Sequence, residues 1–360
     1  MKLSSFSLAA ALLATACQSP DQKQDEPPPK PEQAAPNAQY DALKFVDAEQ
    51  SGKQLPPPPA TMVLEVLLDR LGFSSGVIDG KATRFDELAL RGFQLANGLT
   101  ETGRLDEPTR SALAGLGDVP ATRFVRIPEA FANGPFVPDL PRATSKQVGY
   151  DQLGYRDLIE ALAERFHTTP ETLAALNDPT TKIGAGAIIR VPNIADVDSA
   201  TLPPDERGWN RTLMTLAISP KQAEAAKVVV DKSDGTLRAY DASGKLLAQF
   251  PATMGSQHDP LPIGEWKIQG VSKNPDYHYN PDLFWDAKGS DEGGLIKPGP
   301  NSPVGVVWLD LSKEHYGIHG TGEPASIGIS ESHGCVRLTN WDAVRLAQMV
   351  KPGTPAIFQE

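Results

Sequence analysis

The sequence predicts a multidomain α+β protein, in which two small modules with helices precede a mostly-β domain with one late helix. Apolar residues recur at helical spacing between residues 60 and 195, whereas short β-rich segments separated by turn signals begin at Val228. The length of 360 residues, with 40% hydrophobic residues, suffices for two or three packed cores. A formal net charge of -11 argues against a nucleic-acid partner, because nucleic-acid binders present a basic surface.

Residues 1–17 have the pattern of an export signal. Lys2 precedes an apolar run, Leu3 to Ala16, that is too short to cross a bilayer. The run ends in Ala-Thr-Ala-Cys, which resembles a bacterial lipoprotein signal; this implies that Cys17 is lipidated and becomes the mature N-terminus. Gln18 resembles the residue that directs such proteins to the outer membrane. We therefore expect a periplasmic protein with a lipid anchor in the outer membrane, the cytoplasmic membrane being the alternative.

Residues 18–59 are rich in proline and polar residues, which predicts a disordered linker. Residues 60–116 then predict three short helices. Their motifs L-x-x-L-G-F, G-x-x-D-G, F-Q-x-x-N-G-L and T-G-x-L-D occur in this order. The order resembles the three-helix peptidoglycan-binding domain, which implies that cell-wall glycan is a partner.

Residues 117–150 are Pro-rich and irregular, and we expect a connector. Residues 151–195 resemble a LysM-type βααβ module. Leu158, Leu162 and Phe166 form one helix face, Pro170 begins a second helix, and the stretch 188–192 is strand-like. This module either binds glycan or only packs against its neighbours.

Residues 226–359 predict the β domain. Segments 228–231 and 236–240 flank Ser-Asp-Gly, a hairpin signal, and four further strands are expected at 246–250, 264–268, 304–309 and 316–319. A helix follows at 341–349, with Asn340 as its expected cap.

The chemistry gathers in His319-Gly320 and in Ser332-His333-Gly334-Cys335-Val336-Arg337. With Cys17 taken by lipid, Cys335 is a lone thiol, a liability in an oxidising compartment unless its reactivity is used. Acyl transfer by a thiol needs a base that holds a thiolate, donors for an oxyanion, and an approachable backbone. His319 is the candidate base, oriented by a carbonyl such as that of Gly320. Gly334 opens the backbone, and N–H groups around Cys335 are the candidate donors.

These motifs resemble the catalytic domain of L,D-transpeptidases of the YkuD or ErfK type. The resemblance implies that Cys335 is the nucleophile, His319 the general base, and the backbone of His333, Gly334 and Cys335 the oxyanion hole. Substrate-binding residues would be Ser332, Gly320 and Arg337, although a structural salt bridge is an equal alternative for Arg337. The insertion 272–300, with Tyr279 and Trp285, is either a lid over the substrate groove or an ordinary surface loop.

The implied reaction joins peptidoglycan stem peptides through a Cys335 thioester, giving 3→3 cross-links without metal or other cofactor. The acceptor stays open: a second stem, a lipoprotein lysine, or water, which would make the protein an L,D-carboxypeptidase. A non-catalytic wall-binding lipoprotein is the alternative of another class. A zinc site built from His315, His319, His333 and Cys335 is the chemical rival, since His315 and His319 would share one strand face.

Overall fold

The computed structural model describes residues 37–50 and 54–360. The predicted signal 1–17 with Cys17, and residues 18–36 and 51–53 of the predicted linker, lie outside these residues. Within the described ranges, no helix has both the length and the apolar character required to cross a bilayer.

Three helices form the first module, as predicted: α1 (Met62–Arg70), α2 (Arg84–Ala96) and α3 (Glu107–Ala114). The Thr83 side chain caps α2, and the Asp106 side chain accepts from the Thr109 N–H at the start of α3. Apolar side chains from all three helices share one small core with Leu246 of the β domain. The spacing of leucines and the caps are local signals, which is why the sequence suffices to place these helices.

The second module has a βααβ arrangement. Strand β2 (Thr122–Arg126) pairs antiparallel with β3 (Ile188–Pro192), and α5 (Leu158–Arg165) and α6 (Pro170–Leu176) come between them in the chain. The first strand therefore comes from residues 117–150, where an irregular connector was expected; that expectation is wrong for β2 and for α4 (Glu129–Ala132). Only Val125 of β2 is fully buried, so the strand shows little apolar alternation. The identity of this βααβ arrangement as a LysM-type module stays a prediction.

Further elements join the modules. Strand β1 (Val46–Asp47) extends the small sheet beside β2, and helix α7 (Trp209–Leu216) leads into the β domain. The disordered linker expected over 18–59 is therefore wrong for residues 38–47, where Tyr40, Leu43 and Phe45 are buried in the core. No helix was predicted over 209–216, because Gly208 precedes it without a capping side chain. Three short 3-10 helices, η1 (Ala38–Leu43), η2 (Thr144–Lys146) and η3 (Ser199–Thr201), lie in the connecting segments.

A nine-stranded sheet forms the β domain, in the order β6-β5-β4-β14-β8-β11-β12-β13-β7. A separate hairpin pairs β9 with β10. The strands are β4 (Lys227–Asp231), β5 (Thr236–Tyr240), β6 (Leu246–Pro251), β7 (Thr253–Met254), β8 (Gly264–Lys273), β9 (Tyr277–Tyr279), β10 (Gly294–Ile296), β11 (Val307–Leu311), β12 (Gly317–His319), β13 (Val336–Arg337) and β14 (Pro355–Gln359). Five predicted strands are found near their expected positions, and the one expected at 304–309 occupies 307–311.

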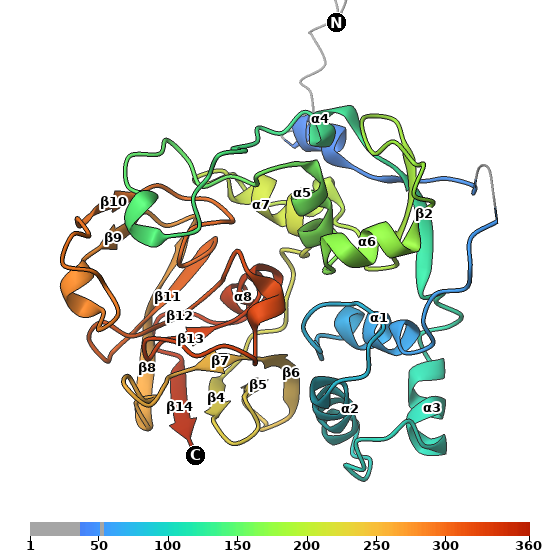
Figure 1. Ribbon diagram of the computed structural model, residues 1–360. Helices are drawn as coiled ribbons and strands as arrows, with labels where there is room; N and C mark the ends of the chain where they lie inside the picture. Colours follow the sequence, from blue (N-terminus) through green and yellow to red (C-terminus); the bar gives the residue numbers. More distant parts are fainter. Residues whose placement is uncertain (1–36, 51–53) are drawn as a thin grey trace, which may run out of the picture. The chain divides into compact units, whose positions relative to one another are not determined.

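Helix α8 (Asn340–Ala347) lies between the sheet and helix α7, with α5 beside α7 (Figure 1). Its cap is Thr339, whose side chain accepts from the Asp342 N–H, and not Asn340 as expected. Asn340 is the first residue of the helix and is fully buried. Its side chain is therefore free to make contacts outside the helix.

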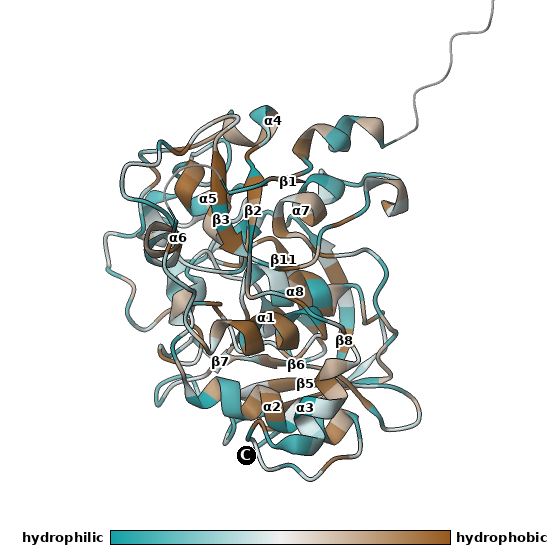
Figure 2. Ribbon diagram, turned by 90° about the vertical axis from the view of Figure 1, so that its right-hand side faces the viewer, coloured by the Kyte–Doolittle hydropathy of each residue, from teal (hydrophilic) through white to brown (hydrophobic). Residues whose placement is uncertain are grey.

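The first module covers the open edge of the sheet. Ser74 N–H donates to the Gln249 carbonyl at 2.9 Å, and Gln249 N–H donates to the Gly72 carbonyl at 3.0 Å. Figure 2 shows hydrophobic residues on β5 and β6 and on the helices α1 and α2 beside them. These contacts pair an edge strand that would otherwise expose unpaired N–H and C=O groups.

Candidate active site

Strand pairing brings the predicted base and Arg337 to one face of the sheet. Strands β12 and β13 are parallel, and His319 lies opposite Arg337. Cys335 precedes Arg337 by two residues, directly before β13. His319 and Arg337 therefore share a face, because residues opposite each other do so, and the charge of Arg337 acts on both His319 and Cys335.

A carbonyl group orients the imidazole. His319 Nδ1 lies 2.7 Å from the carbonyl oxygen of Gly320, the partner expected from the sequence. Since a carbonyl only accepts, Nδ1 carries the hydrogen and Nε2 keeps its lone pair. The ring also stacks on Trp308, with centroids 5.5 Å apart and planes 19° apart. The imidazole is thus fixed as a proton acceptor at Nε2.

Burial keeps this imidazole neutral. His319 is buried, and this lowers its pKa to about 4; the charge of Arg337 acts in the same direction, while the bond to Gly320 opposes both. At neutral pH the ring is therefore unprotonated, as a general base must be.

The thiol of Cys335 is also neutral. Burial raises its pKa to about 11, although the Gly317 N–H and the charge of Arg337 favour the thiolate. The sequence predicts a base that holds a thiolate, whereas burial favours the thiol. The side chain is only partly buried, with Sγ 3.9 Å from the His315 carbonyl oxygen. Proton transfer must therefore accompany attack on the substrate.

A glycine turn shapes the loop before Cys335. Gly334 has φ +91°, and a Cβ added there would lie 2.6 Å from the Tyr316 ring. No hydrogen bond among the described residues uses the N–H groups of His333, Gly334 or Cys335. These three donors are therefore available to an oxyanion, the role predicted for them.

Ser332 and Gly320 hold the loop and the base. The Ser332 hydroxyl donates to the Cys335 carbonyl at 2.7 Å and accepts from the Gly255 N–H at 2.6 Å. The Gly320 carbonyl accepts the hydrogen bond from His319 Nδ1. Their predicted contacts with substrate stay predictions.

Arg337 forms no ion pair within 4 Å among the described residues, although the charge of Glu323 acts on it, so both alternatives for this residue stay predictions. Its Nη2 donates to Ser330 Oγ at 3.1 Å and to the Glu331 carbonyl, and its buried Nε has no partner. The guanidinium thus retains unused donors on the face that carries His319. Bidentate binding of a substrate carboxylate by Arg337 stays a prediction.

The insertion 272–300 lies against the loop that precedes Cys335. Phe284 contacts the His333 ring edge-on at 4.9 Å, and His333 Nε2 lies 2.8 Å from Asp286 Oδ1. Trp285 stacks on His258 at 4.2 Å yet stays 58% exposed, and buried Tyr279 packs on Phe284. This placement fits a lid better than an ordinary loop. The insertion comprises the end of β8, β9, a 3-10 turn η4 (Pro281–Leu283), and β10.

The structure does not have the shared strand face on which the zinc alternative rested. His315 lies outside β12, in a left-handed conformation with φ 65°, so it does not share a strand face with His319. No group of three or more His, Cys, Asp or Glu side chains suited to a metal gathers in the part of the chain that the structure describes.

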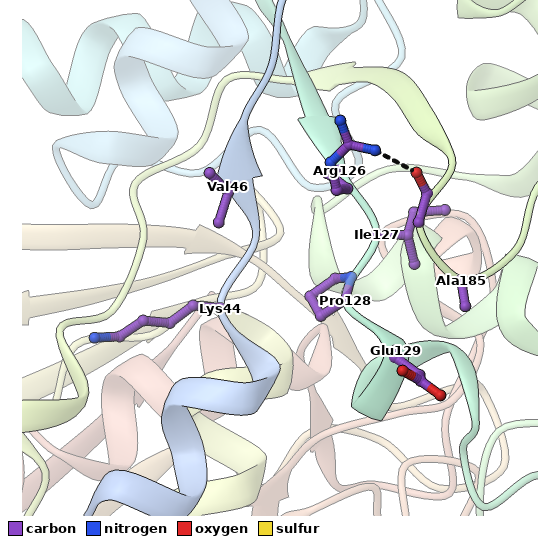
Figure 3. A pocket seen from close by; sticks show the side chains of 8 residues that line it. Lys44, Val46, Arg126, Ile127, Pro128, Glu129 and Ala185 are labelled. Atoms are coloured by element: carbon purple, nitrogen blue, oxygen red, sulfur yellow. Dashed lines mark hydrogen bonds between the residues drawn. The ribbon is translucent and has the colours of Figure 1, made fainter.

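A pocket of about 330 Å³ lies in the second module, and none of the predicted catalytic residues lines it. Arg126 Nη1 crosses it to the Gly186 carbonyl at 2.8 Å (Figure 3). Lys44, from the segment that precedes the first module, and Pro128 and Glu129 are among its other lining residues. The pocket is therefore distinct from the site around Cys335.

Two contacts of the site were not predicted from the sequence. Trp308 stacks on the base from the neighbouring strand, and Asp286 meets His333 from the insertion. The position of Trp308 within a predicted strand was visible, but its strand partner was not.

A partly exposed thiol and a neutral imidazole from neighbouring strands, with unused N–H donors, are the groups that a cysteine acyltransferase requires. Comparison with known proteins specifies the class. Residues 225–358 match the family "YkuD: L,D-transpeptidase catalytic domain", and residues 58–113 match "Putative peptidoglycan binding domain".

The curated relatives agree. The chain is 30% identical to "Putative L,D-transpeptidase YkuD" of Bacillus licheniformis over 200 residues, which are 55% of this chain and 91% of that protein. It is 56% identical to the Bacillus subtilis protein of the same name over 112 residues, 31% of this chain and 53% of that one. A crystal structure of the L,D-transpeptidase from Xylanimonas cellulosilytica is 15% identical, with a TM-score of 0.33, and covers 86% of this chain and 100% of its own. The chain belongs to the L,D-transpeptidase family.

Proposed function

We propose that the protein forms 3→3 cross-links between peptidoglycan stem peptides through a thioester on Cys335. The observation that carries the proposal is the pairing of β12 with β13, which puts His319 opposite Arg337, two residues after Cys335, with the free Nε2 of a neutral imidazole as proton acceptor. Family membership supports a cell-wall transpeptidase; the bond formed and the intermediate are proposed here.

The steps follow from the two neutral groups. The Cys335 thiol passes its proton to His319 Nε2 as sulfur attacks the carbonyl of the third stem residue. N–H groups of the 333–335 loop stabilise the oxyanion. The imidazolium then protonates the departing amine, terminal D-Ala leaves, and the thioester remains. The amine of a second stem attacks the thioester, its proton passes to His319, and the thiol is regenerated.

A product assay tests this function. We expect purified protein with a disaccharide-tetrapeptide to give a dimer that has lost one D-Ala, with no product from Cys335→Ala. Loss of one alanine without dimer would make the protein an L,D-carboxypeptidase. Failure of both reactions, with no thioester detected by intact mass, would contradict the proposal and favour a wall-binding lipoprotein without catalysis.

The location is also proposed. The export signal and Cys17 support a periplasmic enzyme tethered to the outer membrane by lipid, with the peptidoglycan-binding domain directed to the wall. Metabolic labelling with a palmitate analogue, compared with Cys17→Ala, tests the anchor; equal labelling of both proteins would contradict it.

A further inference from the structure

We propose that Glu164, a buried residue of helix α5, is a positioning residue for the base His319 and acts through Asn340 and Gly320. Glu164 lies outside residues 225–358, which match the catalytic family. The inference rests on the proposed function, because it assigns His319 the role of base. It makes the second module a part of the active site.

The first link joins Glu164 to Asn340. The Asn340 amide Nδ2 donates to both Glu164 oxygens, at 3.0 and 3.3 Å, and to the Pro300 carbonyl at 3.0 Å. Its Oδ1 accepts from the Val306 N–H at 3.2 Å. Every polar atom of this side chain has a partner, so the amide is held in one orientation.

The second link joins Asn340 to the orienting carbonyl. A Cβ added at Gly320 would lie 2.3 Å from Asn340 Oδ1, so the glycine backbone rests directly on the amide. The carbonyl of the same glycine accepts from His319 Nδ1 at 2.7 Å. A shift of the amide therefore moves the group that fixes the tautomer and direction of the imidazole.

A second set of hydrogen bonds, around Asn301, supports Gly322, two residues after Gly320. Asn301 Nδ2 donates to the Gly154 carbonyl at 3.0 Å and to Glu160 Oε2 at 3.1 Å. A Cβ added at Gly322 would lie 2.6 Å from Asn301 Oδ1. Residues 154–164 thus support both Gly320 and Gly322 from behind the site.

Glu164 can be replaced without unfolding the protein. Burial raises its pKa to about 8, so the site disfavours the charged form. An apolar side chain here leaves one buried N–H of Asn340 without an acceptor, a loss of stability that a folded domain usually tolerates. Methionine at this position should fold, but it offers Asn340 no acceptor.

The Tyr155 hydroxyl provides a matched control, because it donates to Glu164 at 2.8 Å without contacting Asn340. Three full-length variants are compared with wild type: Tyr155→Phe, Tyr155→Phe/Glu164→Met, and Glu164→Gln. The double variant removes the acceptor and leaves no unpaired hydroxyl, whereas glutamine keeps one acceptor for Asn340 and restores the link.

Two readouts are needed: the rate constant for acylation by a carbapenem, separated from its binding constant, and the tautomer of His319 by ¹⁵N NMR. We expect the double variant to fold with a melting temperature a few degrees below wild type, to acylate about tenfold or more slowly at unchanged binding, and to lose the pure Nδ1–H tautomer. Tyr155→Phe and Glu164→Gln should match wild type in both readouts.

Wild-type rate and tautomer in a folded double variant would overturn the inference while leaving the proposed function intact. Equal losses in Tyr155→Phe would also overturn it, since they would indicate general loosening. Should the double variant not fold, Asn340→Ala removes the middle link between Glu164 and Gly320, and an unchanged tautomer in folded Asn340→Ala would overturn the inference. Absence of acylation in the wild type would instead refute the proposed function.

Discussion

Gly334→Ala tests how the loop before Cys335 is shaped. Gly334 has φ +91°, and a non-glycine residue in such a conformation costs about 1–3 kcal/mol. The new methyl group would lie 2.6 Å from Tyr316, whereas ordinary contacts begin at 3.4 Å. The loop or the ring must therefore move by about 0.8 Å, the difference between these distances.

We expect a displacement of this size beside the nucleophile to slow acylation about 100-fold, the usual cost of a misplacement near 1 Å. The melting temperature should fall by about 2–4 °C for each kcal/mol of strain. Acylation followed by intact mass and thermal unfolding followed by circular dichroism measure the two effects.

Gly353→Ala is the matched control. Gly353 has φ +95°, but a Cβ there meets no atom within 4 Å. It should lose similar stability and keep the wild-type acylation rate. If Gly334→Ala acylates as fast as Gly353→Ala, the shape of the loop does not govern the nucleophile and the reasoning is refuted.

Three further predictions concern charge and the lid. Because burial raises the pKa of Cys335 to about 11, alkylation by iodoacetamide should keep rising through pH 9; a plateau below pH 7 would contradict this. Trp285→Ala should leave the melting temperature unchanged, since the ring is 58% exposed, but raise KM for the tetrapeptide; an unchanged KM would exclude a lid contact with substrate. Asp69 pairs with buried His167 at 3.0 Å, so Asp69→Ala should cost about 3–5 kcal/mol in urea denaturation. Exposed Glu87→Ala should cost under about 1 kcal/mol, and equal costs would contradict the importance of burial.

Local signals allowed much of the fold to be predicted. The caps and apolar spacing of α2 and α3 lie within the helices themselves. Strand β13 has two residues, and β2 buries one side chain fully, so both depend on pairing with distant strands. Helix α7 begins after a glycine without a side-chain cap, and no start signal was visible.

The residues of the site also divide into those that local motifs predict and those that only the tertiary structure reveals. Cys335, Gly334 and His319 lie in short motifs whose chemistry is legible in the sequence. Glu164 precedes His319 by more than one hundred residues, and only tertiary packing shows that it supports the base. The raised pKa of Cys335 follows from burial, which spacing does not reveal. The reacting groups are therefore predictable from the sequence, whereas the protonation state of the thiol is not.

Peptide mapping after brief exposure to a carbapenem tests most directly whether Cys335 attacks with His319 as its base. The account predicts a single adduct, on the peptide that contains Cys335, formed about 100-fold to 10,000-fold more slowly in His319→Gln. An adduct on another residue, or an equal rate in His319→Gln, would contradict it.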